Sequence, residues 1–468
     1  MFSLRQALGW LSTGRLLGAA VAQSSSVLAG VCTDSRALAA GQLFVALRGE
    51  RFDGHDFVER AIDAGAAAVM VDRPPETIRV PVLLVPDTRV GLGEIAAGWR
   101  ARFRLPVIAV TGSNGKTTVK DMIAAILAEH YGEAERLATR GNLNNEIGLP
   151  LTLFRLDSSH RVAVLELGMN RPGEIAWLAQ LARPSIGLVN NAQREHQEFM
   201  HTVEAVAREN GAVIEALPAD GTAVFPADDA FAPLWRELAA GRRRIEFGQR
   251  EPAAVSAPAQ ARPEAFELCI DGQRREAQLT IAGRHNVHNA LAAAACTHAL
   301  GVPIDAIVAG LEAFRPAAGR LVRHRLAGGA TVIDDSYNAN PDSVRAAIEL
   351  LADAGGRTLL VLGDMGEVGA QGPAFHREVG EHAARCRLSA LMTLGAQARL
   401  AAEAFGAGAS AFDSLEALTE AIGEAVHGPD APATTVLIKG SRFMRMERLV
   451  SALLANEQPA ASGAAGVH

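Results

Sequence analysis

The feature that most constrains this chain is a short apolar run that leads into a glycine-bracketed loop and then a helical pattern. The apolar run covers residues 107–110, and the helical pattern covers residues 119–129. The loop between them comprises Thr111, Gly112, Ser113, Asn114, Gly115, Lys116, Thr117 and Thr118. Two glycines allow successive N–H groups to converge on a phosphate, and the helix N-terminus adds further donors. This order predicts a phosphate-binding loop between a strand and a helix.

All eight loop residues are expected to contribute to an ATP site. Lys116 would reach the β- and γ-phosphates, and the Thr117 hydroxyl would bind Mg²⁺. The general phosphate-loop pattern has a glycine five positions before Gly115, where this chain has Val110, so the loop is a shortened variant. The alternative is a glycine-rich turn with a chance lysine–threonine pair. The position between strand and helix favours phosphate binding, although the loop does not identify the acceptor.

The length of 468 residues exceeds what one hydrophobic core usually serves, so about three domains are expected. Alternating aliphatic runs and helical patterns predict an α/β fold with parallel sheets. The predicted domains are residues 1–104, 105–315 and 316–455, followed by a disordered tail at 456–468. The third domain is expected to have Rossmann-like topology.

Several elements are predicted from local patterns. Strands are expected at residues 42–47, 67–71, 107–110, 162–167, 186–190, 331–333, 358–362, 388–394 and 435–438. A helix is expected to start at Pro341, since proline is favoured in a first helical turn. Residues 8–22 are predicted to form an amphipathic helix, and residues 250–264 a surface excursion.

The composition argues against several classes of protein. The net charge of −7 gives no reason to expect nucleic-acid binding. The four cysteines are scattered, which fits a reducing cytoplasm better than a disulfide framework or a zinc site. Residues 8–22 lack a strongly basic leading segment and contain Arg15, so a signal peptide is disfavoured. No apolar run approaches about 18 residues, so no membrane span is expected.

Further motifs follow one order along nearly the whole chain. They lie at residues 33–36, 49–55, 141–145, 166–168, 196, 283–289, 334–341, 363–367 and 439–442. In their order and spacing, the chain resembles the Mur ligase family. The resemblance implies a UDP-sugar-binding first domain, a central ATP-binding domain and a Rossmann-like C-terminal ligase domain.

The segment at 337–341, Tyr-Asn-Ala-Asn-Pro, is similar to the D-alanyl-D-alanine-adding members of the family. The diaminopimelate- or lysine-adding members usually show a His-Pro pair there. The resemblance implies that ATP activates the terminal carboxylate of UDP-N-acetylmuramoyl-tripeptide as an acyl phosphate. The amine of D-alanyl-D-alanine then attacks, and ADP and phosphate leave. A cytoplasmic, monomeric enzyme is expected, while the third peptide residue, diaminopimelate or lysine, stays open.

The expected catalytic residues are Lys116, Glu166 and His196, and the expected Mg²⁺ ligands are Thr117, Glu166 and His196. A carboxylate that attacks a polyphosphate meets charge repulsion, so cations must bridge the reactants. Glu166 ends a predicted strand, where α/β sheets place ligand-binding groups. The alternatives are a solvated strand-end carboxylate for Glu166 and a surface turn for His196.

One position departs from the family pattern. Many Mur ligases carry, past this histidine, a lysine that becomes carbamylated and bridges two Mg²⁺ ions, but Asn210 aligns there. Asparagine is neutral and cannot carry a carbamate. Either Glu204 or Glu209 replaces the missing charge, or the second metal is held more weakly. We predict that bicarbonate does not stimulate the enzyme.

Further ATP-site residues are expected to be Asn289, Arg320 and Asp335. Asp335 would bind ribose hydroxyls or a metal-bound water, or alternatively cap the helix at Pro341. Arg320 follows a presumed hinge and would reach the γ-phosphate after closure, unless it is a surface arginine. The expected substrate-binding residues are polar and come from all three domains: Ser35, Arg36, Asn145, Tyr337, Asn338, Asn340, Lys439 and Arg442. Arg36 suits the uridine diphosphate because arginine binds phosphate in a bidentate manner.

Two other functions compete with this interpretation. The first is a related amide ligase that adds a single amino acid, such as the diaminopimelate-adding enzyme or folylpolyglutamate synthase. The segment at 337–341 and the separate first domain disfavour it. The second is a P-loop regulatory protein that hydrolyses ATP without a second substrate.

Overall fold

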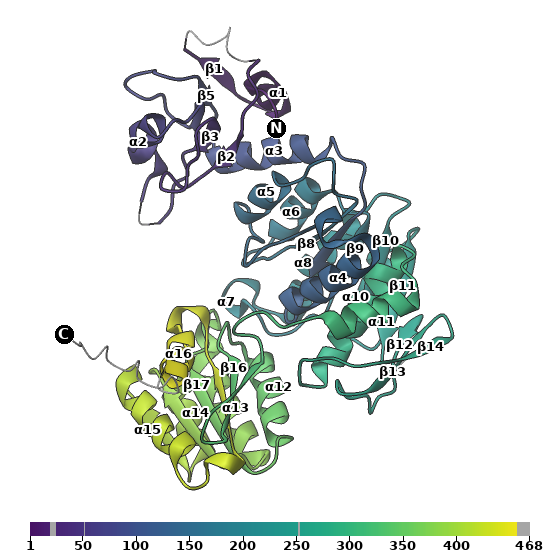
Figure 1. Cartoon of the computed structure of the whole chain (residues 1–468), viewed down its shortest axis with the longest axis vertical. Coiled ribbons are helices and arrows are strands. Elements are labelled where there is room, and N and C mark those ends of the chain that lie inside the picture. Colours follow the sequence, from purple (N-terminus) through teal and green to yellow (C-terminus); the bar gives the residue numbers. More distant parts are fainter. Residues whose placement is uncertain (19–24, 51, 251–252, 456–468) are drawn as a thin grey trace, which may run out of the picture.

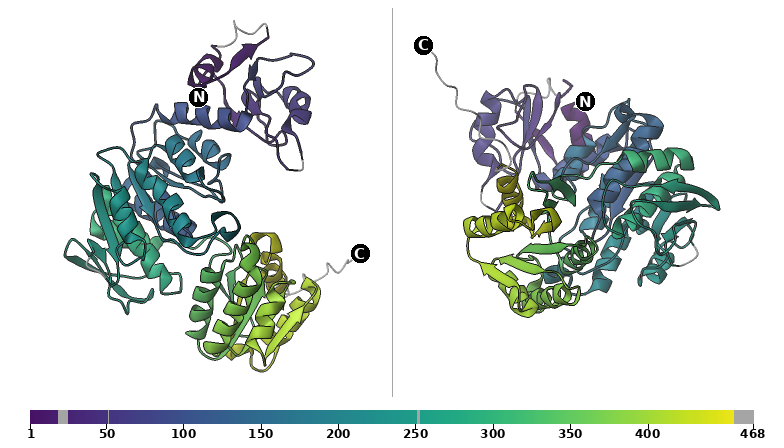
Figure 2. Two further views of the ribbon diagram at one scale, coloured as in Figure 1. Left: turned by 180° about the vertical axis from the view of Figure 1, so that it is seen from behind. Right: turned by 60° about the horizontal axis from the view of Figure 1, so that its bottom comes forward.

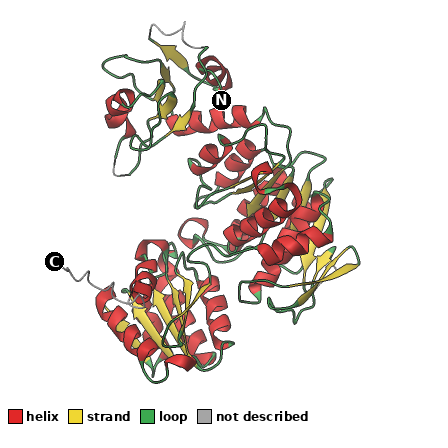
Figure 3. Ribbon diagram, viewed as in Figure 1, coloured by secondary structure: helices red, strands yellow, loops and turns green. Residues whose placement is uncertain are grey.

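The computed structural model describes residues 1–18, 25–50, 52–250 and 253–455. Three β-sheets follow one another along the chain, each covered by helices (Figures 1 and 3). The part that carries the second sheet lies between the other two, which gives the molecule a curved outline (Figure 2). The predicted α/β fold with three domains is therefore confirmed. The tail predicted at 456–468 lies outside the described residues.

The first sheet has five short strands in the order β1-β5-β4-β3-β2, all parallel except β1. Their bounds are β1 Arg15–Leu17, β2 Gly30–Cys32, β3 Gln42–Val45, β4 Ala68–Val71 and β5 Val82–Leu84. Helices α1 (Leu4–Trp10), α2 (Val58–Asp63) and α3 (Thr88–Arg100) accompany the sheet. The strands predicted at 42–47 and 67–71 are confirmed.

The helix predicted over residues 8–22 is wrong for residues 11–18, and residues 19–22 lie outside the described part of the chain. Helix α1 starts earlier because Ser3 and Gln6 form a capping box at its N-terminus. It ends before Leu11, and Arg15 then begins edge strand β1, which pairs with β5. Backbone pairing with a neighbouring strand outweighed the local helical pattern, which cannot register such a neighbour.

The central sheet has nine strands in the order β14-β13-β12-β11-β10-β9-β6-β8-β7. Strands β6 to β12 run parallel, and β13 and β14 are antiparallel additions at one edge. The bounds are β6 Val107–Thr111, β7 Arg136–Ala138, β8 Val162–Glu166, β9 Ile186–Val189, β10 Thr222–Pro226, β11 Arg243–Gly248, β12 Val255–Ser256, β13 Phe266–Ile270 and β14 Gln273–Ala277. The prediction that residues 250–264 form a surface excursion from the sheet is wrong in part. Val255 is buried, and its strand β12 pairs with β11.

Helices cover both faces of the central sheet because strand side chains alternate between the faces. In β6, Ile108 and Val110 face one apolar core, and Val107 and Ala109 face the other. The first core includes α4 (Lys116–Tyr131), α10 (His285–Ala299) and α11 (Ile304–Ala313). The second includes α5 (Gly148–Leu153), α6 (Glu174–Ala182), α8 (Val203–Glu215) and α9 (Ala232–Leu238). Consequently β6 is buried on both faces and ends at the phosphate loop.

Helix α3 attaches the first domain to the central one. The Trp99 indole N–H donates to the Leu156 carbonyl at 3.2 Å. A Cβ at Gly93 would lie 3.0 Å from Trp177 on α6, so the two helices approach closely. One apolar core therefore continues from the first sheet into the central domain.

The third sheet has the order β15-β16-β20-β17-β18-β19, parallel except for edge strand β15. Its strands are β15 Val322–Arg325, β16 Thr331–Asp335, β17 Arg357–Gly363, β18 Ala390–Leu394, β19 Ala409–Phe412 and β20 Thr434–Lys439. Its helices are α12 Pro341–Ala352, α13 Gly372–Arg385, α14 Ala398–Phe405, α15 Leu415–His427 and α16 Glu447–Ala455. The helix start at Pro341 is confirmed. In the described part of the chain, no helix has the length and apolar character needed to cross a membrane.

Candidate active site

A cavity of about 1230 Å³ lies where the central and C-terminal domains meet. Most of the predicted site residues line it, although they come from segments far apart in the sequence. These are Ser113, Asn114, Gly115, Lys116, Thr117, Thr118, Asn145, Glu166, His196, Asn289, Arg320, Asp335, Tyr337, Asn338, Asn340, Lys439 and Arg442. Thr111 and Gly112 belong to the loop but do not line the cavity, and Ser35 and Arg36 lie in the first domain.

The phosphate loop is held rigidly from behind. Gly115 has a φ of 80°, and a Cβ there would lie 2.5 Å from Asn289 Oδ1. The Gly112 N–H donates to Asn210 Oδ1 at 2.9 Å, and the Thr111 hydroxyl donates to the Leu188 carbonyl at 2.8 Å. These contacts fix the loop backbone before any ligand binds, which reduces the entropy lost on binding.

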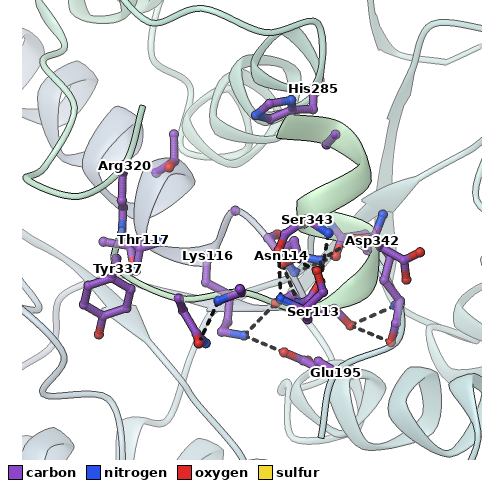
Figure 4. Close-up of a pocket in the computed structure, with 18 of the residues that line it drawn as sticks. Ser113, Asn114, Lys116, Thr117, Glu195, His285, Arg320, Tyr337, Asp342 and Ser343 are labelled. Carbon is purple, nitrogen blue, oxygen red and sulfur yellow. Dashed lines mark hydrogen bonds and ion pairs between the residues drawn. The ribbon is translucent and has the colours of Figure 1, made fainter. Parts of the chain in front are cut away.

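The Lys116 ammonium folds over its own loop (Figure 4). It donates to the carbonyls of Gly112 and Ser113, and it lies 3.2 Å from Glu195 Oε2. The Glu195 carboxylate is 6% exposed. A single cation therefore stands at the mouth of the loop, where a terminal phosphate would arrive.

Glu166 is a buried carboxylate at the end of β8, 3% exposed. Its Oε1 accepts from the Asn144 amide at 2.7 Å, whereas its Oε2 has no hydrogen-bond partner among the described residues. A buried carboxylate oxygen without a partner is costly unless a cation or a proton satisfies it. Together with the Thr117 hydroxyl on the same cavity wall, these oxygen donors fit Mg²⁺.

His196 lies on the loop between β9 and α7 (Gln197–Met200). Its backbone is left-handed, with a φ of 47°, which is uncommon for a residue other than glycine. Its Nδ1 lies 2.7 Å from Glu367 Oε2, and its Nε2 lies 3.8 Å from Glu195 Oε2. The interaction with His196 lowers the pKa of Glu367 below its usual value. The imidazole therefore sits between an acidic group of each domain.

Neither acidic residue expected to compensate for Asn210 is available. Glu209 accepts from the N–H groups of Gly173 and Ile175, both at 2.8 Å. Glu204 pairs with Arg208 on the exposed face of α8. Asn210 itself is 1% exposed and supports the phosphate loop through Gly112. The expectation that Glu204 or Glu209 supplies the charge is therefore wrong, because both side chains are engaged elsewhere.

Asp335 and Lys439 end neighbouring parallel strands, β16 and β20, and their charged atoms lie 2.6 Å apart. Lys439 also donates to the Asn338 carbonyl at 2.9 Å. Burial raises the pKa of Asp335, although the nearby lysine opposes the shift. The helix-capping role considered for Asp335 is wrong, because Asn340 accepts from Ser343 N and caps α12.

Two arginine side chains lie against the Tyr337 ring. The guanidinium carbon of Arg320 lies 4.2 Å from the ring centroid, and that of Arg442 lies 5.8 Å away. Arg320 is therefore stacked inside the cavity rather than spread over the surface (Figure 4). Two positive charges beside a flat aromatic ring suit an anionic or planar ligand group.

Polar contacts join the central domain to the C-terminal domain across the cavity. The Asn340 amide donates to Asn114 Oδ1 at 2.8 Å, so the loop contacts the start of α12. Arg194 pairs with Asp342 at 2.6 Å and with Glu378 at 2.7 Å. The C-terminal domain therefore closes one side of the phosphate loop.

Comparison with known proteins identifies the family. The models described as "Mur ligase family, catalytic domain", "Mur ligase middle domain" and "Mur ligase, glutamate ligase domain" match residues 27–100, 110–297 and 319–442. The UDP-N-acetylmuramoyl-tripeptide–D-alanyl-D-alanine ligase of Escherichia coli (strain K12) is 40% identical over 447 residues, 95% of this chain and 96% of that enzyme. The chain belongs to the Mur ligase family.

Solved structures agree with the fold of this Mur ligase. A crystal structure of MurF from Acinetobacter baumannii has a TM-score of 0.88 at 33% identity and covers 97% of this chain and 99% of that one. The MurF ligase from Thermotoga maritima, crystallised with ADP, has a TM-score of 0.81 at 26% identity and covers 91% and 96%. The three-domain arrangement is therefore shared over nearly the whole chain.

Sequence reasoning missed two residues of the Mur ligase site. The Asn144 amide donates to Glu166, whereas the oxygen of its neighbour Asn145, a predicted substrate-binding residue, accepts from Gly148 N at 2.9 Å. Glu195 has no role in the sequence-based prediction. The one available signal was its position beside His196, which did not show that its side chain is buried.

Ser35 and Arg36, which are predicted to bind the uridine diphosphate, do not line the cavity. Arg36 is 77% exposed and pairs with Asp34, and it lies in the loop after β2 with Ser35. An exposed arginine is free to reorient towards a ligand. The role of these two residues stays a prediction.

Proposed function

We propose that this Mur ligase joins D-alanyl-D-alanine to UDP-N-acetylmuramoyl-tripeptide with consumption of ATP. The observation that carries the proposal is the cavity in which the phosphate loop, Glu166 and the Asp335–Lys439 pair face one another. The proposal is supported by relatives that bear this name and match nearly the whole chain, among them the Escherichia coli enzyme. The segment at 337–341 supports the choice of the dipeptide.

In the proposed site, ATP binds across the two domains. The loop residues from Thr111 to Thr118 hold the phosphates, with Lys116 at the terminal one and Asn289 behind Gly115. Arg320 and Asp335 would contact the nucleotide from the C-terminal side. Thr117, Glu166 and His196 would hold Mg²⁺, which neutralises phosphate charge when bound.

The acid and the amine meet beside that phosphate. The tripeptide carboxylate attacks the γ-phosphorus and forms an acyl phosphate, and ADP leaves. The amine of D-alanyl-D-alanine then attacks the acyl carbon and displaces phosphate. Most substrate contacts are assigned to polar groups that line the cavity: Asn145, Tyr337, Asn338, Asn340, Lys439 and Arg442. Ser35 and Arg36 are assigned to the uridine diphosphate.

We further assign the enzyme to the cytoplasm as a monomer. The four cysteines are free in the structure, which suits a reducing compartment. Light scattering coupled to size-exclusion chromatography tests the monomer.

The decisive experiment measures ADP formation while each substrate is omitted in turn. We expect sustained ADP formation over many turnovers only when ATP, Mg²⁺, UDP-N-acetylmuramoyl-tripeptide and D-alanyl-D-alanine are all present, whereas without the dipeptide ADP should not exceed about one per enzyme molecule. Consumption of a single amino acid in place of the dipeptide would contradict the assigned specificity. ATP hydrolysis without either peptide substrate would favour a regulatory ATPase instead.

A further inference from the structure

Phe443 and Arg445 form a part of the cavity wall to which the proposed reaction assigns no role. Both line the cavity from the C-terminal domain, in the segment between β20 and α16. Phe443 is 63% exposed, so most of its ring is uncovered. Within the described chain, the Arg445 guanidinium has neither an ion pair nor a hydrogen bond. The wall therefore presents an apolar face and an uncompensated positive charge to the same space.

Neighbouring backbone holds this wall in place. The Gly366 N–H donates to Ser441 Oγ at 2.7 Å, and the Ser441 hydroxyl donates to the Ala339 carbonyl at 3.0 Å. A Cβ at Gly366 would lie 2.8 Å from the Phe443 ring, so the ring lies against the backbone there. Arg445 has a left-handed backbone with a φ of 51°, which is uncommon for a residue other than glycine. Such a backbone persists where its surroundings fix it, and it often occurs at ligand sites.

Two other cavity-lining cations of the same segment are already engaged. Arg442 pairs with Glu447 at 2.9 Å, and Lys439 pairs with Asp335 at 2.6 Å. Each of these charges is therefore partly neutralised by the protein itself. Arg445 is the cation of residues 439–445 whose whole charge is left for a ligand.

The wall also borders the reacting end of the cavity. Glu367, which follows Gly366, lies 2.7 Å from His196 of the central domain. The first domain, to which the uridine diphosphate is assigned, lies on the other side of the central domain (Figures 1 and 2). The wall is therefore better placed for the amine acceptor than for the sugar nucleotide.

We propose that Phe443 and Arg445 determine the choice of the amine acceptor, D-alanyl-D-alanine. This inference rests on the proposed function. The dipeptide reacts through its amine and keeps its own carboxylate, which the Arg445 guanidinium binds in a bidentate manner. Its methyl groups pack on the Phe443 ring and are withdrawn from water. Arg445 thus selects an acceptor with a free carboxyl end, and Phe443 selects one with apolar side chains.

Steady-state kinetics test the arginine. We expect Arg445→Gln to raise the KM for D-alanyl-D-alanine about tenfold or more, while kcat and the KM values of ATP and UDP-N-acetylmuramoyl-tripeptide change by less than about twofold. Arg448→Gln is the matched control, because Arg448 is an exposed arginine on α16 that does not line the cavity. It should keep the wild-type values.

The carboxylate contact has its own probe, D-alanyl-D-alaninamide, which lacks the negative charge. In kcat/KM, the wild type should prefer the acid over the amide by about tenfold or more, and Arg445→Gln by less than about twofold. A role of Arg445 in folding alone would not remove this preference. A wild type that uses the acid and the amide equally overturns the inference and leaves the proposed function intact.

The phenylalanine is tested with D-alanylglycine, which lacks one methyl group. Phe443→Ala should reduce the preference for D-alanyl-D-alanine over D-alanylglycine by about fourfold. Phe443→Leu keeps an apolar side chain and should retain most of that preference. Equal preferences in the wild type and Phe443→Ala overturn the role of the ring.

A second arginine variant separates loss of the contact from loss of the fold. Glycine adopts a φ of 51° without strain, so Arg445→Gly should fold and should lose the preference for the acid as Arg445→Gln does. An unchanged preference in either folded variant overturns the inference, as does a rise in the KM of UDP-N-acetylmuramoyl-tripeptide in place of that of the dipeptide. A wild type that does not consume D-alanyl-D-alanine contradicts the proposed function and, with it, the inference.

Discussion

At the scale of single residues, the site depends on charges that the fold has removed from water. Lys116, Glu166 and Glu195 are largely buried, and each is partly satisfied by groups that do not belong to a substrate. Such charges interact strongly with a nucleotide because little solvent screens them. Removal of one partner atom would leave such a charge buried and unpaired, which is costly.

Replacing Lys116 with alanine should remove the cation from the mouth of the loop. We expect kcat for ADP formation to fall by at least about 100-fold, since a positioned cation supplies several kcal/mol of transition-state stabilisation. Arg208→Gln, which changes an exposed cation on α8, should keep normal turnover. A Lys116→Ala protein with undiminished kcat would contradict the proposed role of the loop.

Replacing Asn210 with alanine should destabilise the protein, because the Gly112 N–H would be left without its acceptor in a buried place. The expected loss is about 1–3 kcal/mol in the free energy of unfolding, measured by urea titration. Asn210→Asp retains an acceptor oxygen and serves as the comparison. Added bicarbonate should change the turnover of none of these proteins, and stimulation of the wild type would contradict the neutral role of Asn210.

At the scale of elements, the phosphate loop works because two glycines bring the backbone close to neighbouring side chains. Gly115 has the left-handed backbone that disfavours side chains, and Asn289 occupies the space where its Cβ would lie. Gly132, at the other end of α4, also has a positive φ but has open space around it. A side chain at Gly132 would meet backbone strain alone, whereas a side chain at Gly115 would meet backbone strain and a clash with Asn289.

Gly115→Ala and Gly132→Ala should therefore differ. Both substitutions force an alanine into a backbone of positive φ, which costs about 1–3 kcal/mol of stability. Only Gly115→Ala should also displace Asn289 and weaken ATP binding, by roughly tenfold or more, as measured by isothermal titration calorimetry. Equal nucleotide affinities in the two variants would show that the close approach has no role in binding.

Local patterns predicted some elements of the site and could not predict others. The loop, the strand that ends at Glu166 and the start of α12 follow from glycine spacing, aliphatic runs and a proline in a first turn. The Asn114–Asn340 contact joins residues 226 positions apart, so it depends on how two domains dock. The burial of Glu195 likewise depends on the order of strands in the sheet and on the position of Lys116. Residue spacing carries neither piece of information.

At the scale of the whole molecule, the junction between the central and C-terminal domains is rich in charge. Arg194 of the central domain pairs with Asp342 and Glu378 of the C-terminal domain, and His196 of the central domain contacts Glu367 of the C-terminal domain. The hydrogen bond from Arg194 lowers the pKa of Glu378 to about 2, from an ordinary value of 4.5. The strength of this junction should therefore depend on pH.

The sign of that dependence follows from the depressed pKa. The stabilisation is fully present above pH 4.5, the unperturbed value, and is lost as the pH falls towards about 2. Arg194→Gln should lower the melting temperature at pH 7, and its difference from the wild type should shrink steadily below pH 4.5. The exposed Arg208→Gln control should show no such convergence. A constant difference between wild type and Arg194→Gln across this range would contradict the assignment.

The folded-over position of Lys116 has a consequence for the product side of the reaction. Its ammonium is surrounded by two backbone oxygens and a carboxylate, so the loop presents little net attraction to a bare anion. Inorganic phosphate that arrives without a metal ion would have to displace Glu195 unaided. Released phosphate should therefore be a weak inhibitor, so the enzyme should retain its turnover when inorganic phosphate is abundant.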